Sequence, residues 1–174
     1  MPRNINTHGG GSQTNVNGLS FEQGTLLNDA LIALGYTISN HQVLDSNNSL
    51  CGLSVEKYKF YNNFLIPNNV NYKTYNSKKW LPDDCFINYK TKTVYIIEKK
   101  FQNSPGSVDE KLASCEFKKK EYEKLCNPIN YSVEYLYVFN DWFKKEQYKD
   151  ILEYIMEKGC NYFYNQIPLS FLGL

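Results

Sequence analysis

The stretch WLPDDCFINYKTKTVYIIEKKFQ, residues 80–102, decides the fold because two apolar runs in it flank a polar turn. Residues 84–89 and 94–101 alternate or run apolar around Lys-Thr-Lys, which is the pattern of a β-hairpin with one well-buried strand. Two adjacent acids precede the first run, and an acid followed by two lysines closes the second. An antiparallel hairpin brings these charged ends to the same edge of a sheet.

The register of the hairpin determines which charged side chains meet. The simplest pairing across the turn places Asp83 opposite Lys100. Side chains alternate between the faces of a strand, so Asp83, Glu98 and Lys100 then share one face. A bulge or a three-residue turn would substitute Asp84 for Asp83. In either case we expect two carboxylates and an ammonium to converge.

Such a cluster has a chemical use. Mg²⁺ prefers carboxylate oxygens and keeps several waters, and a metal held by an Asp and a Glu polarises a phosphoryl oxygen and lowers the pKa of a bound water. Lys100 would orient that water and stabilise its hydroxide. The alternative is a solvated strand end in which Glu98 and Lys100 form an ordinary surface ion pair.

The motif resembles that of the PD-(D/E)xK nuclease superfamily. It consists of Pro82-Asp83, fourteen intervening residues, Glu98-Lys99-Lys100, and Gln102, which extends it to the ExKxQ form. Residues 98–102 with 105–112 look like a segment that recurs in type II restriction endonucleases. The family core is a helix, a three-stranded antiparallel unit, a helix and a further strand, so the resemblance covers about residues 20–139.

The resemblance assigns roles to the charged residues. It makes Asp83 and Glu98 the metal ligands and Lys100 the catalytic lysine. The doubled acid departs from the literal motif and keeps Asp84 as an alternate ligand. We favour Asp83, because it directly follows Pro82 and shares a face with Glu98 and Lys100 in the simplest register.

Two further residues enter the predicted site through the same resemblance. Glu22, expected on the first helix, looks like the extra acid that many family members place near the metal; the alternative is a solvated glutamate that suits the helix dipole. Gln102 shares the face of Glu98 and Lys100, where it helps to place the scissile phosphate or simply finishes the strand.

The function implied by the resemblance is that of a Mg²⁺-dependent endodeoxyribonuclease, a type II restriction endonuclease that hydrolyses specific double-stranded DNA sequences without a nucleotide cofactor. Cutting both strands of a palindrome requires two copies, so we expect a homodimer. The alternatives are a structure-selective junction or repair nuclease, and a catalytically silent DNA-binding subunit.

The remaining patterns predict an α/β domain over residues 20–174, a restriction-endonuclease-like core with a central mixed sheet flanked by helices (αβββαβ). Ser20 with Gln23 has capping-box spacing and starts a helix that Gly35 ends. A short extended piece follows at 72–75. Further helices are expected at 107–125 and 141–158, and strands at 131–139 and 160–164. Residues 1–19 are polar and glycine-rich, and we expect a flexible arm.

DNA contacts are expected from two places. In and after the motif, lysines suited to phosphates are Lys99, Lys111, Lys118 and Lys119. In the acid-free arm, amide side chains suited to groove edges are Gln13, Asn15 and Asn17. The alternatives are i, i+4 ion pairing along a solvated helix for the lysines that follow the motif, and a disordered tail for the arm.

Composition bounds the remaining possibilities. With 174 residues, 42% apolar residues and a net charge of +1, the chain has enough apolar residues for one core and no overall charge bias toward nucleic acid. Five cysteines form no CxxC pair, and Cys85 and Cys160 lie in apolar runs as free buried thiols. This pattern favours a reducing, cytoplasmic location. No apolar run is long enough to span a bilayer, and no zinc motif occurs.

Overall fold

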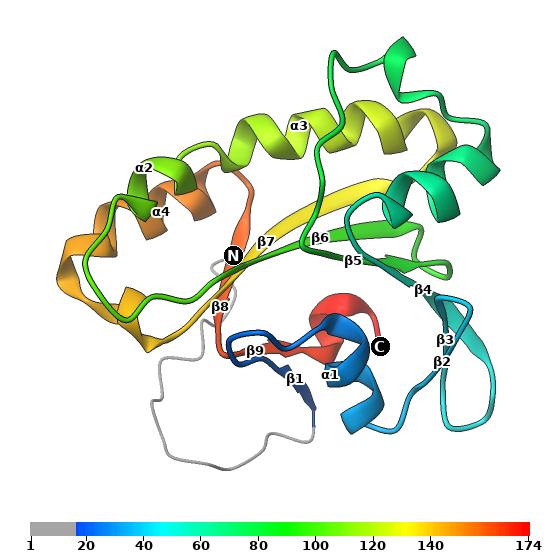
Figure 1. The fold of residues 1–174 in the computed structure, drawn as a ribbon, viewed down its shortest axis with the longest axis horizontal. Coiled ribbons are helices and arrows are strands. Elements are labelled where there is room, and N and C mark those ends of the chain that lie inside the picture. Colours follow the sequence, from blue (N-terminus) through cyan, green and yellow to red (C-terminus); the bar gives the residue numbers. More distant parts are fainter. Residues whose placement is uncertain (1–16) are drawn as a thin grey trace.

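The computed structural model describes residues 17–174 and shows an α/β architecture around a mixed, seven-stranded sheet (Figure 1). Gln13 and Asn15 of the expected arm lie outside the described residues. The strands follow the order β2-β3-β4-β5-β6-β7-β8 across the sheet. Their bounds are Thr37–Ser39, Gln42–Leu44, Leu50–Val55, Asp84–Asn88, Thr93–Lys100, Ser132–Phe139 and Asn161–Tyr164.

The type of strand pairing changes once across this sheet. Strands β2 to β6 are antiparallel neighbours, joined by local turns except for the long connection between β4 and β5, whereas β6, β7 and β8 run parallel. The parallel pairs require crossover connections, which the helices supply. The helices are α1 (Leu27–Ala33), α2 (Val108–Leu112), α3 (Cys115–Cys126) and α4 (Lys149–Glu157). In the described part of the chain, none is long and apolar enough to cross a membrane.

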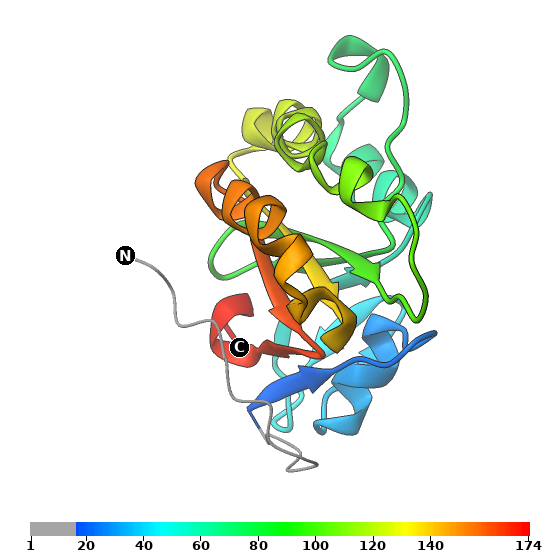
Figure 2. The ribbon, with the colours of Figure 1, turned by 90° about the vertical axis from the view of Figure 1, so that its left-hand side faces the viewer.

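Each face of the sheet is covered by its own hydrophobic core. Helices α2, α3 and α4 lie on one side, and α1 lies on the other with the small sheet of β1 (Gly18–Ser20) and β9 (Gln166–Pro168), as Figures 1 and 2 show. The first core takes Cys85, Ile87, Val94 and Ile96 from the hairpin strands. The second takes Phe86, Tyr95 and Ile97.

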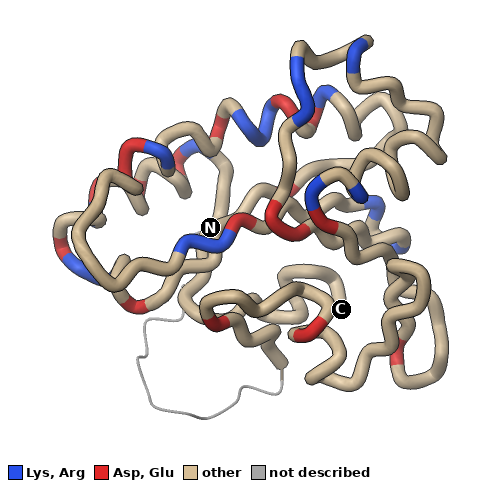
Figure 3. The backbone as a smooth tube through the Cα atoms, in the orientation of Figure 1, with Lys and Arg blue, Asp and Glu red and all other residues tan. Residues whose placement is uncertain are grey.

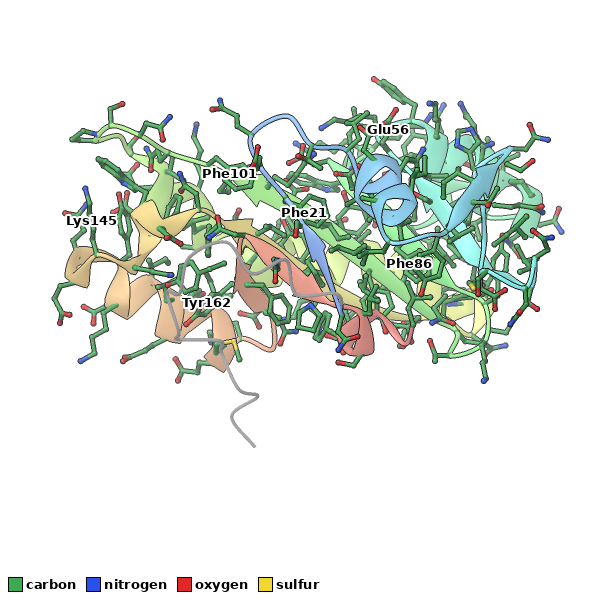
Figure 4. All side chains as sticks on the ribbon, turned by 90° about the horizontal axis from the view of Figure 1, so that it is seen from below. Phe21, Glu56, Phe86, Phe101, Lys145 and Tyr162 are labelled. Atoms are coloured by element: carbon green, nitrogen blue, oxygen red, sulfur yellow. The ribbon has the colours of Figure 1, made fainter. Side chains whose placement is uncertain are left out.

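This alternation is the period of two expected for a strand buried on both faces. Figure 4 views the molecule from the side of the second core, where the labelled Phe21 and Phe86 lie.

The predicted hairpin is present, but its register differs from the simplest pairing. Asp84 pairs with Ile97 and Asn88 with Thr93, so the predicted opposition of Asp83 and Lys100 is wrong by two positions. The cause is Asn88, whose side-chain oxygen accepts the N–H groups of Lys90 and Thr91 at 2.9 and 3.0 Å and starts the turn one residue early. A shift of two positions leaves every side chain on its predicted face.

The N-terminal prediction needs two corrections. Gly18 and Leu19, assigned to the flexible arm, form β1 with Ser20, and Leu19 is fully buried. Ser20 therefore does not cap a helix, and α1 starts only at Leu27. Gly35 does adopt a left-handed conformation, with φ of 92°, just after the helix ends.

Several other elements are shorter or of a different type than predicted. Residues 72–75 form a 3₁₀ turn (Tyr72–Thr74) instead of an extended piece. The predicted helix 107–125 is two helices, α2 and α3, and only the second half of 141–158 is α-helical, after 3₁₀ turns at Asp141–Lys144 and Glu146–Tyr148. The remaining one-turn elements are Tyr61–Leu65, a π-helix, and the 3₁₀ turns Ile66–Asn68, Asn127–Ile129 and Leu169–Leu172.

Candidate functional site

The charged ends of β5 and β6 meet near the middle of the molecule, where acidic and basic backbone positions adjoin in Figure 3. Continuing the register of the hairpin past Asp84 places Asp83 beside Glu98. The structure thus brings Asp83, Glu98 and Lys100 to one face, with the Lys100 ammonium 3.7 Å from Glu98 Oε2. This face is the one that α3 covers, so the cluster lies where the sheet meets that helix.

Asp83 has a partner that the sequence did not indicate. The Lys57 ammonium lies 2.6 Å from Asp83 Oδ1, and the N–H of Lys99 donates to Oδ2 at 3.2 Å. Burial raises the pKa of Asp83, but the hydrogen bond and charge of Lys57, followed by the charge of Lys100, outweigh it and lower that pKa. Asp83 is therefore held in its ionised form.

Lys57 reaches the site through tertiary structure alone. Val55 of β4 pairs with Cys85, and the same register continued by two residues sets Lys57 opposite Asp83. Its N–H donates to the carbonyl of Pro82 at 2.9 Å, with its own φ at 47°. Lys57 lies 26 positions before Asp83 and belongs to no motif, so only knowledge of the β4–β5 pairing would have found it.

Glu98 is the most perturbed acid of the cluster. It is 7% exposed, and burial raises its pKa to about 7, with the neighbouring Asp83 carboxylate adding to the effect. The charges of Lys100, Lys118 and Lys57 oppose this shift without cancelling it. Among the described residues, no hydrogen bond to the Glu98 carboxylate compensates for its burial. The ionised form of Glu98 is therefore destabilised, and a further cation bound beside it would stabilise that form.

Asp84 lies on the opposite face and is engaged there. Its Oδ2 pairs with the Lys99 ammonium at 2.9 Å, and its Oδ1 accepts the N–H of Leu27 at 3.3 Å. Lys99 also donates to the carbonyl of Thr25. Lys99, which we expected to contact DNA, has a side chain only 14% exposed and ties α1 to the sheet instead. The alternate ligand Asp84 is thus separated from Glu98 by the sheet.

Gln102 follows the end of β6 and is braced by a residue outside the motif. Its N–H donates to Asn140 Oδ1 at 3.2 Å, and Asn140 Nδ2 donates to its carbonyl at 2.7 Å. Its side-chain Oε1 is buried and accepts no hydrogen bond within residues 17–174. Gly106 makes room for the side chain, because a Cβ there would lie 2.7 Å from Gln102 Nε2.

Glu22 does not lie on a helix. It is exposed in the turn between β1 and α1, where its N–H donates to Thr25 Oγ1 at 3.0 Å. The carbonyl of Thr25 accepts from Lys99, so this turn is held from the Asp84 side of the sheet. The structure does not bring Glu22 into the group of charges that act on Asp83 and Glu98.

The remaining predicted DNA contacts fall into two groups. Lys111 is exposed on α2, and Lys118 on α3 lies close enough to Glu98 to lower its pKa. The Lys119 ammonium has partners within the protein, since it donates to the carbonyl of Gly159 at 2.9 Å and lies 4.0 Å from Glu123 Oε1. Asn17 stands at the entrance to β1, where its carbonyl accepts the N–H of Leu169 at 2.7 Å.

The donor chemistry of the cluster fits a hard divalent cation. Residues 17–174 contain no group of three or more His, Cys, Asp or Glu side chains arranged to hold a metal, and the cluster offers two carboxylates. Mg²⁺ is commonly bound through one or two carboxylates, with water completing its shell. The buried Glu98 and the partly exposed Asp83 repel each other, and such a cation would stabilise them.

Comparison of the chain with protein-family models, with curated proteins and with solved structures finds no match. The functional argument therefore rests on the geometry and electrostatics of the site.

Proposed function

We propose that the chain is a Mg²⁺-dependent endodeoxyribonuclease built on a restriction-endonuclease-like core. The observation that carries the proposal is the placement of Glu98 beside Asp83 on a buried sheet face, with the pKa of Glu98 raised to about 7 and Lys100 3.7 Å away. Structural ion pairs satisfy their charges, as Asp84 and Lys99 do at 2.9 Å. Asp83 and Glu98 instead keep two acids together at a cost, which is typical of a functional site.

Asp83 and Glu98 would hold the metal ion in this proposal. Bound there, Mg²⁺ would polarise a phosphoryl oxygen and lower the pKa of an attacking water. Lys100 sets a positive charge beside the carboxylates, where negative charge develops on the phosphoryl group, and Lys57 and Lys118 add to the same field. Lys57, with 52% of its side chain exposed, is free to turn from Asp83 toward a phosphate.

The leading substrate class is duplex DNA cut at specific sequences, as in type II restriction endonucleases, by a homodimer whose two copies each cut one strand. The order of α1, the antiparallel strands ending in β6, α3 and the parallel β7 supports the proposed core. A cytoplasmic location belongs to the same proposal, because all five cysteines are free thiols.

The test is cleavage of unmethylated phage DNA by the purified protein, with Mg²⁺ or with EDTA, and analysis on a gel. We expect discrete bands only with Mg²⁺, and a loss of at least about 10³-fold in rate for Glu98→Gln, since metal stabilisation of a transition state is worth several kcal/mol. The matched control is Glu134→Gln on β7, an acid that accepts from Asn161 at 3.1 Å. Full activity in Glu98→Gln would overturn the proposal.

Metal binding can be measured separately from cleavage, through its effect on the melting temperature. At pH 8 the wild-type melting temperature should rise with added MgCl₂, because the cation binds the folded protein and relieves the charge on Glu98. Glu98→Gln should lose most of this shift, whereas Glu134→Gln should keep it. An equal shift in wild type and Glu98→Gln would place the ion elsewhere.

A further inference from the structure

Residues 57–80, which connect β4 to β5, have an unusual composition. They contain five lysines and no acid, together with seven aromatic residues. The segment packs along α3, because Asn76 Nδ2 donates to the carbonyl of Glu121 at 2.9 Å and the rings of Trp80 and Phe117 meet edge to face at 5.7 Å. It forms the upper right of Figure 1. A surface that combines positive charge with aromatic rings suits an anionic partner with flat apolar groups.

An open cleft of about 430 Å³ lies in this segment. The rings of Tyr61 and Tyr72 stand edge to face at 5.9 Å on one side, and Ile66, 59% exposed, lines the cleft as well. The Lys79 ammonium lies 5.0 Å from the Tyr72 ring and 5.3 Å from the Tyr61 ring. Asn69 and Asn71 bring amide groups to the same cleft. Rings, amides and a cation around one opening form a site for a flat polar molecule that carries negative charge.

A second aromatic position adjoins the cleft. Trp80 has the Lys78 ammonium at 3.8 Å from its ring and that of Lys118 at 6.0 Å, and its neighbour Phe117 is 55% exposed. None of the ion pairs in the described residues involves Lys78, Lys79 or Lys118. The charges of these three lysines are therefore available to a ligand.

Other lysines of α3 form ion pairs within the helix, unlike Lys118. Lys120 pairs with Glu116 at 3.0 Å and Lys124 with Glu121 at 3.3 Å, as expected for a solvated helix. Lys118 projects instead toward Trp80 and acts on Glu98. The unpaired positive charge thus collects between the cleft and the acidic cluster.

The cleft and the candidate site are joined by a short piece of chain. Asp83 lies four positions after Lys79 in the chain, so their Cα atoms lie within about 15 Å of each other. The hydroxyl of Tyr61 donates to the carbonyl of Trp80 at 2.7 Å and fixes this link. Lys57, bound to Asp83 at 2.6 Å, precedes Tyr58, whose ring lies 5.7 Å from the Lys79 ammonium. One nucleic-acid strand can therefore contact both places.

We propose that this aromatic-lysine surface binds an unpaired stretch of the DNA substrate, with one base stacked in the cleft beside Tyr72 and the flanking phosphates on Lys78, Lys79 and Lys118. The proposal rests on the proposed nuclease function for the identity of the substrate. Duplex DNA keeps its bases stacked inside the helix, whereas unpaired bases offer a free face to an aromatic ring. The surface thus gives the enzyme a preference for duplex DNA that is locally opened beside the cut.

The test is binding without cleavage, by fluorescence anisotropy of labelled DNA in EDTA at one fixed salt concentration. The probes are an oligothymidylate of about 16 nucleotides, a perfect duplex, and the same duplex with a central unpaired run. We expect wild type to bind the two unpaired probes more tightly than the perfect duplex. Tyr72→Ala should weaken binding of the unpaired probes about 5- to 150-fold, the range that corresponds to loss of one stacked base.

Lys79→Gln should also weaken binding and flatten its salt dependence, because one phosphate contact is lost. The control is Lys145→Gln, whose ammonium lies 3.1 Å from the ring of Trp142 on a separate 3₁₀ turn; it should bind as wild type does. Equal affinity for all three probes, or unchanged affinity in both Tyr72→Ala and Lys79→Gln, would overturn the inference. Because binding is measured in EDTA, a failed cleavage assay and a failed binding assay remain distinguishable.

Discussion

The two faces of the β5–β6 hairpin carry nearly the same charged residues and treat them differently. On one face, Asp84 is 2% exposed and both of its oxygens are engaged, by Lys99 at 2.9 Å and by the N–H of Leu27 at 3.3 Å. On the other face, Asp83 and Glu98 lie side by side, and the nearest cation to Glu98 is Lys100 at 3.7 Å. The first face pairs its acid closely with a buried lysine, whereas on the second face Glu98 is buried with no cation nearer than Lys100.

This contrast separates acid–lysine pairs that stabilise the fold from acids that belong to the candidate site. A buried acid–lysine pair in close contact holds elements together, and Asp84 with Lys99 joins α1 to the sheet in this way. A buried acid placed next to another acid costs stability, so the protein benefits from it only when something else binds. Adjacent positions in the chain, Asp83-Asp84 and Lys99-Lys100, reach these opposite situations because a strand alternates its side chains.

The largest expected contrast is in cleavage. Asp83→Asn should lower the rate of Mg²⁺-dependent cleavage by at least about 10³-fold, because a metal ligand is lost. Asp84→Asn, assayed at a temperature where it is folded, should retain most of the activity because its side chain lies on the other face. Initial rates on phage DNA measure both. A folded Asp84→Asn protein without activity would make Asp84 the ligand and break the comparison.

The next contrast is in stability. Asp84→Ala should lower the free energy of unfolding by about 3 kcal/mol, because it leaves the largely buried Lys99 ammonium without its carboxylate partner. This corresponds to a fall of about 6–12 °C in melting temperature for a chain of this size. Asp83→Ala should cost about 1 kcal/mol or less, since its main partner Lys57 is half exposed. Urea titration measures both, and equal losses would remove the distinction between the faces.

The pH dependence of stability sharpens the same comparison. The pKa of Glu98 rises from 4.5 to about 7 on folding, so the folded state binds more protons between these values. The free energy of unfolding should therefore fall as pH rises from about 4.5 to about 7, by on the order of 1–3 kcal/mol. Glu98→Gln should remove the Glu98 contribution to this fall, leaving that of Asp84, whose pKa burial also raises, and should be the more stable protein at pH 8 without metal. Urea midpoints at pH 5 and pH 8 test this, and an identical pH profile in the variant would contradict it.

The smallest expected effect is on the titration of Glu98 itself. Burial is the largest cause of its raised pKa and Asp83 the second, so Asp83→Asn should bring the pKa below about 7 and leave it above 4.5. Carbon-detected NMR of the Glu98 carboxyl group follows this directly. Asp84→Asn is the matched control, and an equal decrease in it would mean that the two acids act on Glu98 alike.

The hairpin, the α/β class and the sheet face of each charged residue in the hairpin could be predicted from the sequence alone. Period two and two apolar runs suffice for that, and an error of two positions in register leaves the faces of Asp83, Glu98 and Lys100 unchanged. The helix that follows the motif was also visible in outline, although a break divides it into α2 and α3.

The partners of these charged side chains, in contrast, depend on contacts between elements that are distant in the chain. Ser20 has the sequence pattern of a helix cap, but it lies in β1 because β1 pairs with β9. Its partner Gln166 is 146 positions away in the chain. Lys57 reaches Asp83 through the β4–β5 register, and Lys99 turns from solvent to Asp84 because α1 packs on that face. Pairing between distant strands and helices fixes desolvation and partner charges, and these cannot be deduced from residues that are neighbours only along the chain.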